Sequence, residues 1–280
     1  MTAALADPPR SAPLGRLLGA ELRWVLRRPR TLVMLGLFAV VPVLISIGVA
    51  VADGSERGPG LIGAIGGNGL VLPVVAMTLS LALLLPLAVA MAAADAIAGE
   101  SAHGTLRGLL LSPVGRLRLV GMKAFGVLVV AVLATLVLAV VGVLAGLLVV
   151  GGAEGQLVTL SGTAVGLGDA LLRVALVAVW VVGQLAAVGA VALAVSAVTE
   201  HPLVVLASVL GGLIVFGVLS AIPALDWLQP WLLTSGWTAG ADALRDPVPL
   251  GAMVESSLRA LCYLAVGGGI TTYRMLRRDA

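Results

Sequence analysis

Side chains that could do chemistry are few in this 280-residue chain. The one cysteine, Cys262 in the last apolar run, excludes a disulfide within the chain and a Cys-x-x-Cys metal site. His103 and His201 are too few and too far apart in sequence to predict a metal cluster. The sequence has no G-x-x-x-x-G-K-[ST] motif, and its only lysine, Lys123, stands in VGMKAF, so a P-loop for ATP is not predicted. We expect no catalytic residue, metal or cofactor in this chain.

Charged side chains gather instead in the polar segment 95–123, which begins with acidic residues and ends with basic ones. Within it Leu106, Leu109 and Leu110 fall at i, i+3 and i+4 and predict one apolar stripe on a short helix. Ser112 and Pro113 then end that helix and start another. This pattern is compatible with an element that docks on a partner protein, and equally with a loop that lies on lipid headgroups. The charged residues are Asp95, Glu100, Arg107, Arg116, Arg118 and Lys123.

The composition of the chain predicts that the regions on either side of this segment lie in a membrane. The chain is 60% hydrophobic and only 11% charged, whereas about 25% of residues are charged in a soluble domain. Its net charge of +3 comes from basic residues dispersed along the chain, which does not predict nucleic-acid binding. We therefore expect an all-α integral membrane protein.

Six apolar runs are long enough to cross about 30 Å of hydrocarbon. A disordered tail over residues 1–13 and an amphipathic interfacial helix over residues 14–28 are expected before the first run. Residues 14–280 then form a single six-span domain. The spans are expected at about 31–52, 70–94, 124–150, 171–198, 203–222 and 252–273.

Arginine positions predict the orientation of these spans. With both termini in the cytoplasm, the cytoplasmic segments hold all of the 17 basic residues except Arg57, Arg173, Arg245 and Arg259. That orientation also places the segment 95–123, between the second and third spans, in the cytoplasm.

Polar residues within spans are the remaining candidates for a transport site. Glu255 and Arg259 lie four residues apart in the last span and are expected to pair. They could line a substrate path or gate, or Arg259 could simply reach the outer interface beside Glu255. Gln184 in the fourth span could contact substrate or bond a neighbouring helix. Trp227, Trp231 and Trp237 before the last span suit an aromatic belt or a substrate exit.

The order and spacing of residues in the segment 95–123 resemble the ABC-2 type permeases, which are the membrane subunits of type V ABC exporters. The matching residues are Glu100, Gly104-Thr105-Leu106, Leu109-Leu110, Pro113, Arg116 and Lys123. In that family this stretch is a cytoplasmic coupling helix that sits in a groove of a separate ATPase subunit. The sequence departs from the family at Ser101-Ala102-His103, where many relatives are more charged, so the choice of ATPase partner stays open.

This resemblance implies a permease subunit of an ATP-driven exporter in the cell (plasma) membrane of a bacterium. A dimer with a second, identical or different, permease would work with two copies of an ATPase that binds ATP and Mg, while this chain is not itself an enzyme. The leucines would fill the ATPase groove, and charged residues would fix the register. The implied docking residues are Glu100, Thr105, Leu106, Arg107, Leu109, Leu110, Pro113 and Arg116.

Two other functions remain open at the level of sequence. An ion-gradient-driven secondary transporter would normally need ionisable groups at mid-membrane, and the sequence has none deeper than Arg259. A membrane scaffold or maturation subunit without cargo of its own fits the sequence nearly as well as export. The sequence does not identify the substrate, although an apolar interior leans towards hydrophobic compounds.

Overall fold

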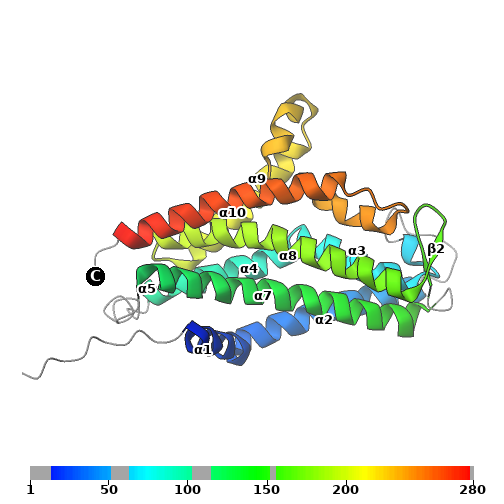
Figure 1. The fold of residues 1–280 in the computed structure, drawn as a ribbon, viewed down its shortest axis with the longest axis horizontal. Helices are drawn as coiled ribbons and strands as arrows, with labels where there is room; N and C mark the ends of the chain where they lie inside the picture. Colours follow the sequence, from blue (N-terminus) through cyan, green and yellow to red (C-terminus); the bar gives the residue numbers. More distant parts are fainter. Residues whose placement is uncertain (1–13, 52–62, 103–114, 152–155, 278–280) are drawn as a thin grey trace, which may run out of the picture.

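The structure, a computed structural model, describes residues 14–51, 63–102, 115–151 and 156–277. It is an elongated bundle in which long helices lie beside one another (Figure 1). The tail 1–13 and the central part of the expected docking segment, 103–114, lie outside the described residues.

The first two helices meet at Pro29. Helix α1 (Leu14–Arg27) is amphipathic, and α2 (Pro29–Val51) is apolar throughout. Pro29 has no amide hydrogen to donate within α1 but is well suited to the first position of α2. Val25 of α1 is buried, whereas Leu22 and Leu26 are exposed, so this helix has one side against the bundle and an apolar side free for lipid.

The next apolar run, expected as one span over residues 70–94, is interrupted. Helix α3 (Leu72–Leu81) follows the 3-10 turn η2 (Gly69–Val71) and stops before Ala82, and α4 (Leu84–Ala94) begins after Leu83. Pro86 explains the break, because its ring clashes with the carbonyl of residue 82 and it has no amide hydrogen to bond that carbonyl. The π-helix η3 (Asp95–Gly99) and the short α5 (Glu100–Ala102) continue α4.

Helix α7 (Arg116–Ala145) continues as the π-helix η4 (Gly146–Val150). Gly142 and Gly146 allow a close approach between segments inside the subunit. A Cβ atom on Gly142 would lie 2.7 Å from the Cα of Pro73, and one on Gly146 would overlap the backbone of Gly69. The two glycines therefore pack the end of α7 against the start of α3.

Short elements cover the bundle end that lies opposite α1. After the 3-10 turn η1 (Gly63–Ile65), strands β1 (Leu157–Val158) and β2 (Ala164–Val165) pair antiparallel, with Leu157 opposite Val165. The 3-10 segments η6 (Pro223–Trp231) and η7 (Trp237–Leu244) precede the last helix. Trp227 and Trp231 are exposed, as an aromatic belt requires, but Trp237 is buried.

Helices α8 (Leu167–Val198) and α9 (Pro202–Ser220) form a hairpin in which only residues 199–201 separate them. Val205 and Val209, both in the first half of α9, are its buried residues. Figure 1 shows the remainder of α9 and η6 standing out from the side of the bundle. Helix α9 thus keeps much apolar surface exposed, including Ile214, Val215 and Val218.

Five helical segments in the described part of the chain are long and apolar enough to cross a membrane: 29–51, 84–102, 116–150, 167–198 and 202–220. Helix α10 (Gly251–Arg277) is long enough and lies along α8, but it is less apolar. Glu255, Arg259 and the three consecutive glycines at 267–269 explain that difference. Cys262, in the last apolar run, is exposed on this helix.

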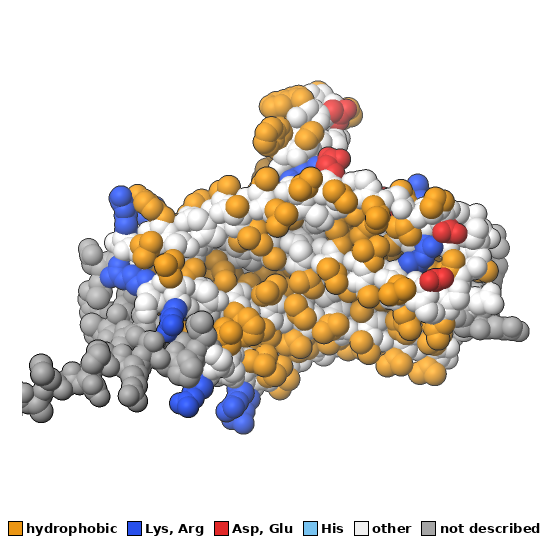
Figure 2. Space-filling view, in the orientation of Figure 1, with side chains coloured by type: hydrophobic (Ala, Val, Ile, Leu, Met, Phe, Trp, Pro, Cys, Tyr) orange, Lys and Arg blue, Asp and Glu red, His pale blue; other side chains and the backbone are white. Residues whose placement is uncertain are grey.

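Basic side chains gather at one end of the bundle, as Figure 2 shows. This end, called the basic end below, is formed by α1, α5, the start of α7 and the end of α10 (Figure 1). Its basic residues in the described part include Arg28, Arg30, Arg116, Lys123 and Arg274.

Candidate functional site

The candidate site is the place where both ends of the expected docking segment join the bundle. Glu100 lies just before the segment 103–114, and Arg116 lies just after it. The remaining expected docking residues fall outside the described residues: Thr105, Leu106, Arg107, Leu109, Leu110 and Pro113. The geometry described below is therefore that of the base of the segment.

A buried lysine links the two ends of this segment. The Nζ of Lys123, on α7, donates to Oε1 of Glu100, on α5, at 2.5 Å, and it lies 4.0 Å from Oε1 of Glu21 on α1. The three side chains are 6%, 15% and 11% exposed. One cation thus lies beside two carboxylates from different helices in a desolvated place, where charge pairing is far stronger than at a surface.

Glycine at position 126 allows Glu21 to enter this cluster. A Cβ atom at Gly126 would lie 2.9 Å from Oε1 and 3.3 Å from Cγ of Glu21. Gly126 is also three residues after Lys123, so both lie on the side of α7 that faces α1. The sequence of α7 therefore provides both the charge and the space that fix α1.

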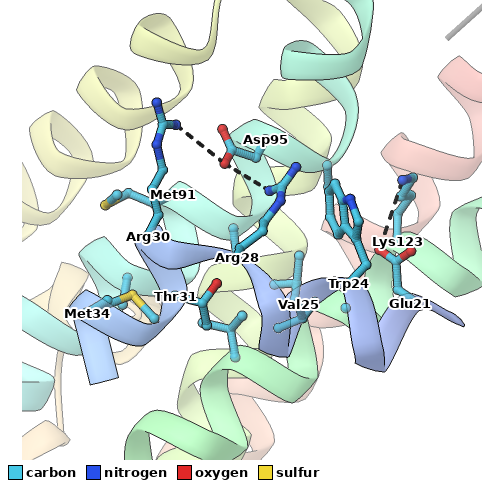
Figure 3. Close-up of a pocket in the computed structure, with 16 residues that line it drawn as sticks. Glu21, Trp24, Val25, Arg28, Arg30, Thr31, Met34, Met91, Asp95 and Lys123 are labelled. Atoms are coloured by element: carbon cyan, nitrogen blue, oxygen red, sulfur yellow. Dashed lines mark hydrogen bonds and ion pairs between the residues drawn. The ribbon is translucent and has the colours of Figure 1, made fainter. Parts of the chain in front are cut away.

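A second charged group lies on the other side of Trp24. Asp95, the first residue of η3, accepts a hydrogen bond from Arg28 at 3.1 Å and lies 3.8 Å from Arg30. The Arg28 guanidinium stacks over the Trp24 ring at 3.2 Å, and Lys123 lies 5.5 Å from the same ring centre. Figure 3 shows Trp24 between the two charged groups. Arg28, at the junction of α1 and α2, thus binds Asp95 at the start of the segment 95–100. Glu21, on α1, is linked through Lys123 to Glu100 at the end of that segment.

Helix α8 also contributes to this base. The backbone amide of Ala98, within the π-helix η3, donates to the buried hydroxyl of Ser196 at 2.9 Å. A π-helix leaves amides without their usual partners, and such turns occur often at functional sites. Asp95 and Glu100 flank this turn, so a change in its winding would move both charged groups relative to their partners.

Burial dominates the electrostatics of Glu21. Desolvation raises the pKa of this carboxyl above its ordinary value, the nearby Glu100 adds to the increase, and Lys123 opposes it. Lys123 lies closer to Glu100 than to Glu21. Glu21 is therefore the less well compensated of the two carboxylates.

Two adjoining cavities open at this cluster. A small one of about 50 Å³, drawn in Figure 3, lies between α1, α2, α4 and α7. A larger cleft of about 830 Å³ is lined by residues that include Glu100, Leu119 and Met122. Within the described ranges, no three His, Cys, Asp or Glu side chains come together as metal ligands would.

The other expected site residues lie away from this cluster. Arg116 donates to the carbonyl of Leu276 near the end of α10, at 2.5 Å. Gln184 is fully buried and accepts a hydrogen bond from Trp237 at 3.3 Å. Lys123, Glu21 and Glu100 are called the Lys123 cluster below. Arg116 and Gln184 therefore join segments at places separate from this cluster.

Arg259 and Glu255 form the expected pair, with Nη2 2.9 Å from Oε1. Arg259 is mostly buried and also donates to the carbonyls of Pro230, Leu232 and Ser235, whereas Glu255 is 70% exposed. Arg259 thus holds the chain that follows η6 against α10.

Sequence reasoning missed Glu21, Trp24 and Ser196 as parts of the site. In the sequence Glu21 belongs to the polar side of an interfacial helix, which predicts contact with water or headgroups. It is buried instead, because α1 lies against α7 at a glycine. The one local signal was the small residue Gly126 a turn after the only lysine.

Comparison with known proteins identifies the family. No curated protein matches the chain. A model described as "ABC-2 family transporter protein" matches residues 16–236, which include α1, the candidate site and the spans as far as η6. The match covers well over half of the sequence and contains every residue of the Lys123 cluster, so the chain belongs to the ABC-2 transporter family.

Proposed function

We propose that this protein is the permease subunit of an ATP-driven exporter, with its basic end in the cytoplasm. Family membership supports an ABC ATPase as its partner in general. The gathering of arginines at one end supports the orientation through the positive-inside rule. In this proposal α10 is a sixth span, since it runs along α8 over a comparable length, and both termini are cytoplasmic.

The observation that carries the coupling proposal is the buried Lys123–Glu100 ion pair at the base of the segment 103–114. In the proposal, this segment is the coupling helix, and a separate ATPase subunit binds it through Leu106, Leu109 and Leu110. Glu100, Arg107 and Arg116 fix the register, with Thr105 and Pro113 shaping the helix. Because Lys123 and Glu100 join the two ends of the segment, a force on it reaches α4 and α7 together.

Helix α1 extends this coupling to α2. Glu21 shares Lys123 with Glu100, and Arg28 holds Asp95 at the other end of η3. A displaced coupling helix would therefore move the entry to α2 as well as α4 and α7. ATP binding to the partner biases the bundle only through its different affinity for the two arrangements.

A second permease subunit is proposed to pack against α9 and η6. That surface stands apart from the bundle and exposes Ile214, Val215, Val218 and Trp231. The cargo would cross between the two subunits, and hydrolysis would take place on two ATPase copies that hold ATP and Mg. Glu255, Arg259 and Gln184 are proposed as structural residues at the border of that path, since Arg259 and Gln184 each bond a neighbouring segment and Glu255 pairs with Arg259 in the same helix.

Co-purification tests the proposal. We would co-express the chain with the P-loop ATPase encoded nearest to it and purify the complex in mild detergent. Leu110→Arg should abolish co-purification without loss of membrane insertion. Leu160→Arg, at an exposed leucine beside β1, is the matched control and should leave the complex intact. A complex that survives Leu110→Arg, or no association with any such ATPase, would overturn the coupling proposal.

A second variant, Lys123→Met, tests the role of the buried ion pair in coupling. This variant should retain the ATPase, because its side chain is buried below the docking segment, but cargo should no longer stimulate ATP hydrolysis. A wild-type complex whose ATPase activity responds to no cargo would favour a scaffold or maturation subunit. Transport in vesicles that requires a proton gradient and no ATP would favour a secondary transporter.

A further inference from the structure

An apolar groove runs along the outside of the bundle between α7, α8 and α10. It has a volume of about 380 Å³ and is lined by residues such as Phe125, Leu128, Leu193 and Leu264. In Figure 1 α8 lies between α10 and α7, and Figure 2 shows the surface hollowed along that line. Among the described lining residues, Thr271 alone has a polar side chain, and its hydroxyl donates to the carbonyl of Gly267 in the same helix.

Small residues keep this groove open. A Cβ atom added at Gly121 of α7 or at Gly268 of α10 would meet nothing within 4 Å. At Gly267, one residue earlier, the same atom would lie 2.6 Å from the backbone of Ala190, so α10 and α8 are in close contact directly beside the groove. The empty space is therefore a property of the surface and not of loose packing between the helices.

The dimensions of the groove fit one alkyl chain. From Val120 to Ala131 its α7 wall rises about 16 Å, so 380 Å³ corresponds to a mean cross-section of roughly 24 Å². Carbon atoms in contact lie about 4 Å apart, which gives a single alkyl chain a cross-section on the order of 20 Å². The groove therefore has room for one alkyl chain along α8.

The groove ends at arginines. Arg116, one turn before Val120 on α7, reaches across to the carbonyl of Leu276 on α10 at 2.5 Å. Arg274 is exposed three residues after Thr271, and Arg277 stacks over Tyr273 at 4.5 Å. A guanidinium has five N–H donors, so Arg116 can bind a phosphate oxygen in addition to the Leu276 carbonyl. The apolar groove thus ends at the positively charged side chains of Arg116 and Arg274. In the proposed orientation these side chains lie at the level of the lipid headgroups.

We propose that this groove is a binding site for an anionic phospholipid of the cytoplasmic leaflet, with one acyl chain along α8 and the phosphate on Arg116 and Arg274. Basic pockets between membrane helices on the cytoplasmic side suit anionic headgroups. The site lies on α7, α8 and α10 and not on α9, and it shares Val127 of α7 with the small cavity beside Lys123. It depends on the proposed orientation of the basic end but not on the ATPase or on any cargo. The bound lipid would join α7 to α10 beside the base of the docking segment.

Native mass spectrometry of the delipidated protein tests the site. Phosphatidylglycerol and phosphatidylcholine with identical chains would be added separately at equal concentrations. The wild type should retain one phosphatidylglycerol at least about tenfold more strongly than phosphatidylcholine, and added salt should reduce this preference. Gly268→Leu should fill the groove and abolish retention of both lipids. Gly269→Leu, on the neighbouring exposed face where a Cβ also meets nothing within 4 Å, should bind as the wild type does.

Arg116→Gln should remove the preference for phosphatidylglycerol while leaving weak chain binding. Equal binding of the two lipids to the wild type would overturn the anionic assignment. Unchanged binding in Gly268→Leu, with a thermal midpoint like that of Gly269→Leu, would overturn the groove as the site. Loss of a dimer peak in Gly268→Leu alone would assign the groove to a second subunit instead. None of these outcomes depends on ATPase binding, so failure here is separable from failure of the proposed function.

Discussion

Lys123 and Glu100 form an ion pair of 2.5 Å, although α7 and α5 are joined only through the segment that contains the expected docking helix. Both side chains are buried, and the pair closes that segment at its base. Any partner that binds the segment 103–114 therefore acts on a closed loop of chain. In the proposed mechanism, a force that the loop transmits to this base acts on α4 and α7 together.

Replacing Lys123 should show how much the buried ion pair at the base of the segment contributes to the stability of the protein. Lys123→Met leaves two buried carboxylates without their cation, and removing one partner of a buried pair costs about 3–5 kcal/mol. We expect a large fall in the thermal midpoint of the detergent-purified protein at neutral pH. Arg23→Met, at an exposed arginine of α1, is the control and should have little effect. Adding Glu21→Gln and Glu100→Gln to Lys123→Met should recover most of the loss; equal midpoints for the two methionine variants would contradict the buried pair.

Glu21 should make stability depend on pH. Its raised pKa means that the folded protein keeps this proton to higher pH than the unfolded chain does. Unfolding then releases the proton, so the free energy of unfolding is highest below the ordinary pKa of glutamate and falls as pH rises through the raised pKa. Glu21→Gln should remove this part of the fall in thermal midpoint.

The Lys123→Met variant checks the cause of this shift. Lys123 lowers the pKa of Glu21, so its loss should move the fall in stability to higher pH. If Glu21→Gln leaves the pH profile of the wild type unchanged, Glu21 is not the group responsible.

Several features of the fold could be predicted from local sequence. Apolar runs that begin at Pro29 and Pro202 define α2 and α9, and Pro29 also ends the amphipathic α1, because hydrophobicity and proline act locally. The four-residue spacing of Glu255 and Arg259 predicts their pair for the same reason. The break in the second span could also have been predicted from Pro86.

The candidate site could be predicted only in part. The polar segment 95–123 and its charged ends are visible in the sequence, but Glu21 meets Lys123 only because α1 crosses α7 at Gly126. That contact depends on tertiary packing and leaves no periodic pattern. Arg259 likewise holds backbone carbonyls of the chain after η6, and backbone acceptors have no sequence signature.

Gly126→Ala should loosen α1 from α7. The new Cβ would lie 2.9 Å from Oε1 of Glu21, so the carboxylate must move away from Lys123. Overpacking of this kind typically costs about 1–3 kcal/mol. Hydrogen exchange of the α1 amides should become faster, and the thermal midpoint should fall. Gly121→Ala, where a Cβ meets nothing within 4 Å, is the control and should be neutral or slightly stabilising; equal exchange in both variants would show that α1 is not held at this point.

Variants of Arg259 and Glu255 should distinguish a structural role of this pair from a role as a gate. The three guanidinium nitrogens of Arg259 together donate to the carbonyls of Pro230, Leu232 and Ser235 and to the Glu255 carboxylate, whereas a lysine ammonium has a single nitrogen with three donors. We expect Arg259→Met and Arg259→Lys both to increase hydrogen exchange after η6 and to lower the thermal midpoint. Glu255→Gln should change little, because that carboxylate is 70% exposed and surface pairs are weak. If Glu255→Gln instead abolished transport while stability and exchange stayed normal, the pair would be part of a gate, since a purely structural contact cannot fail in that way.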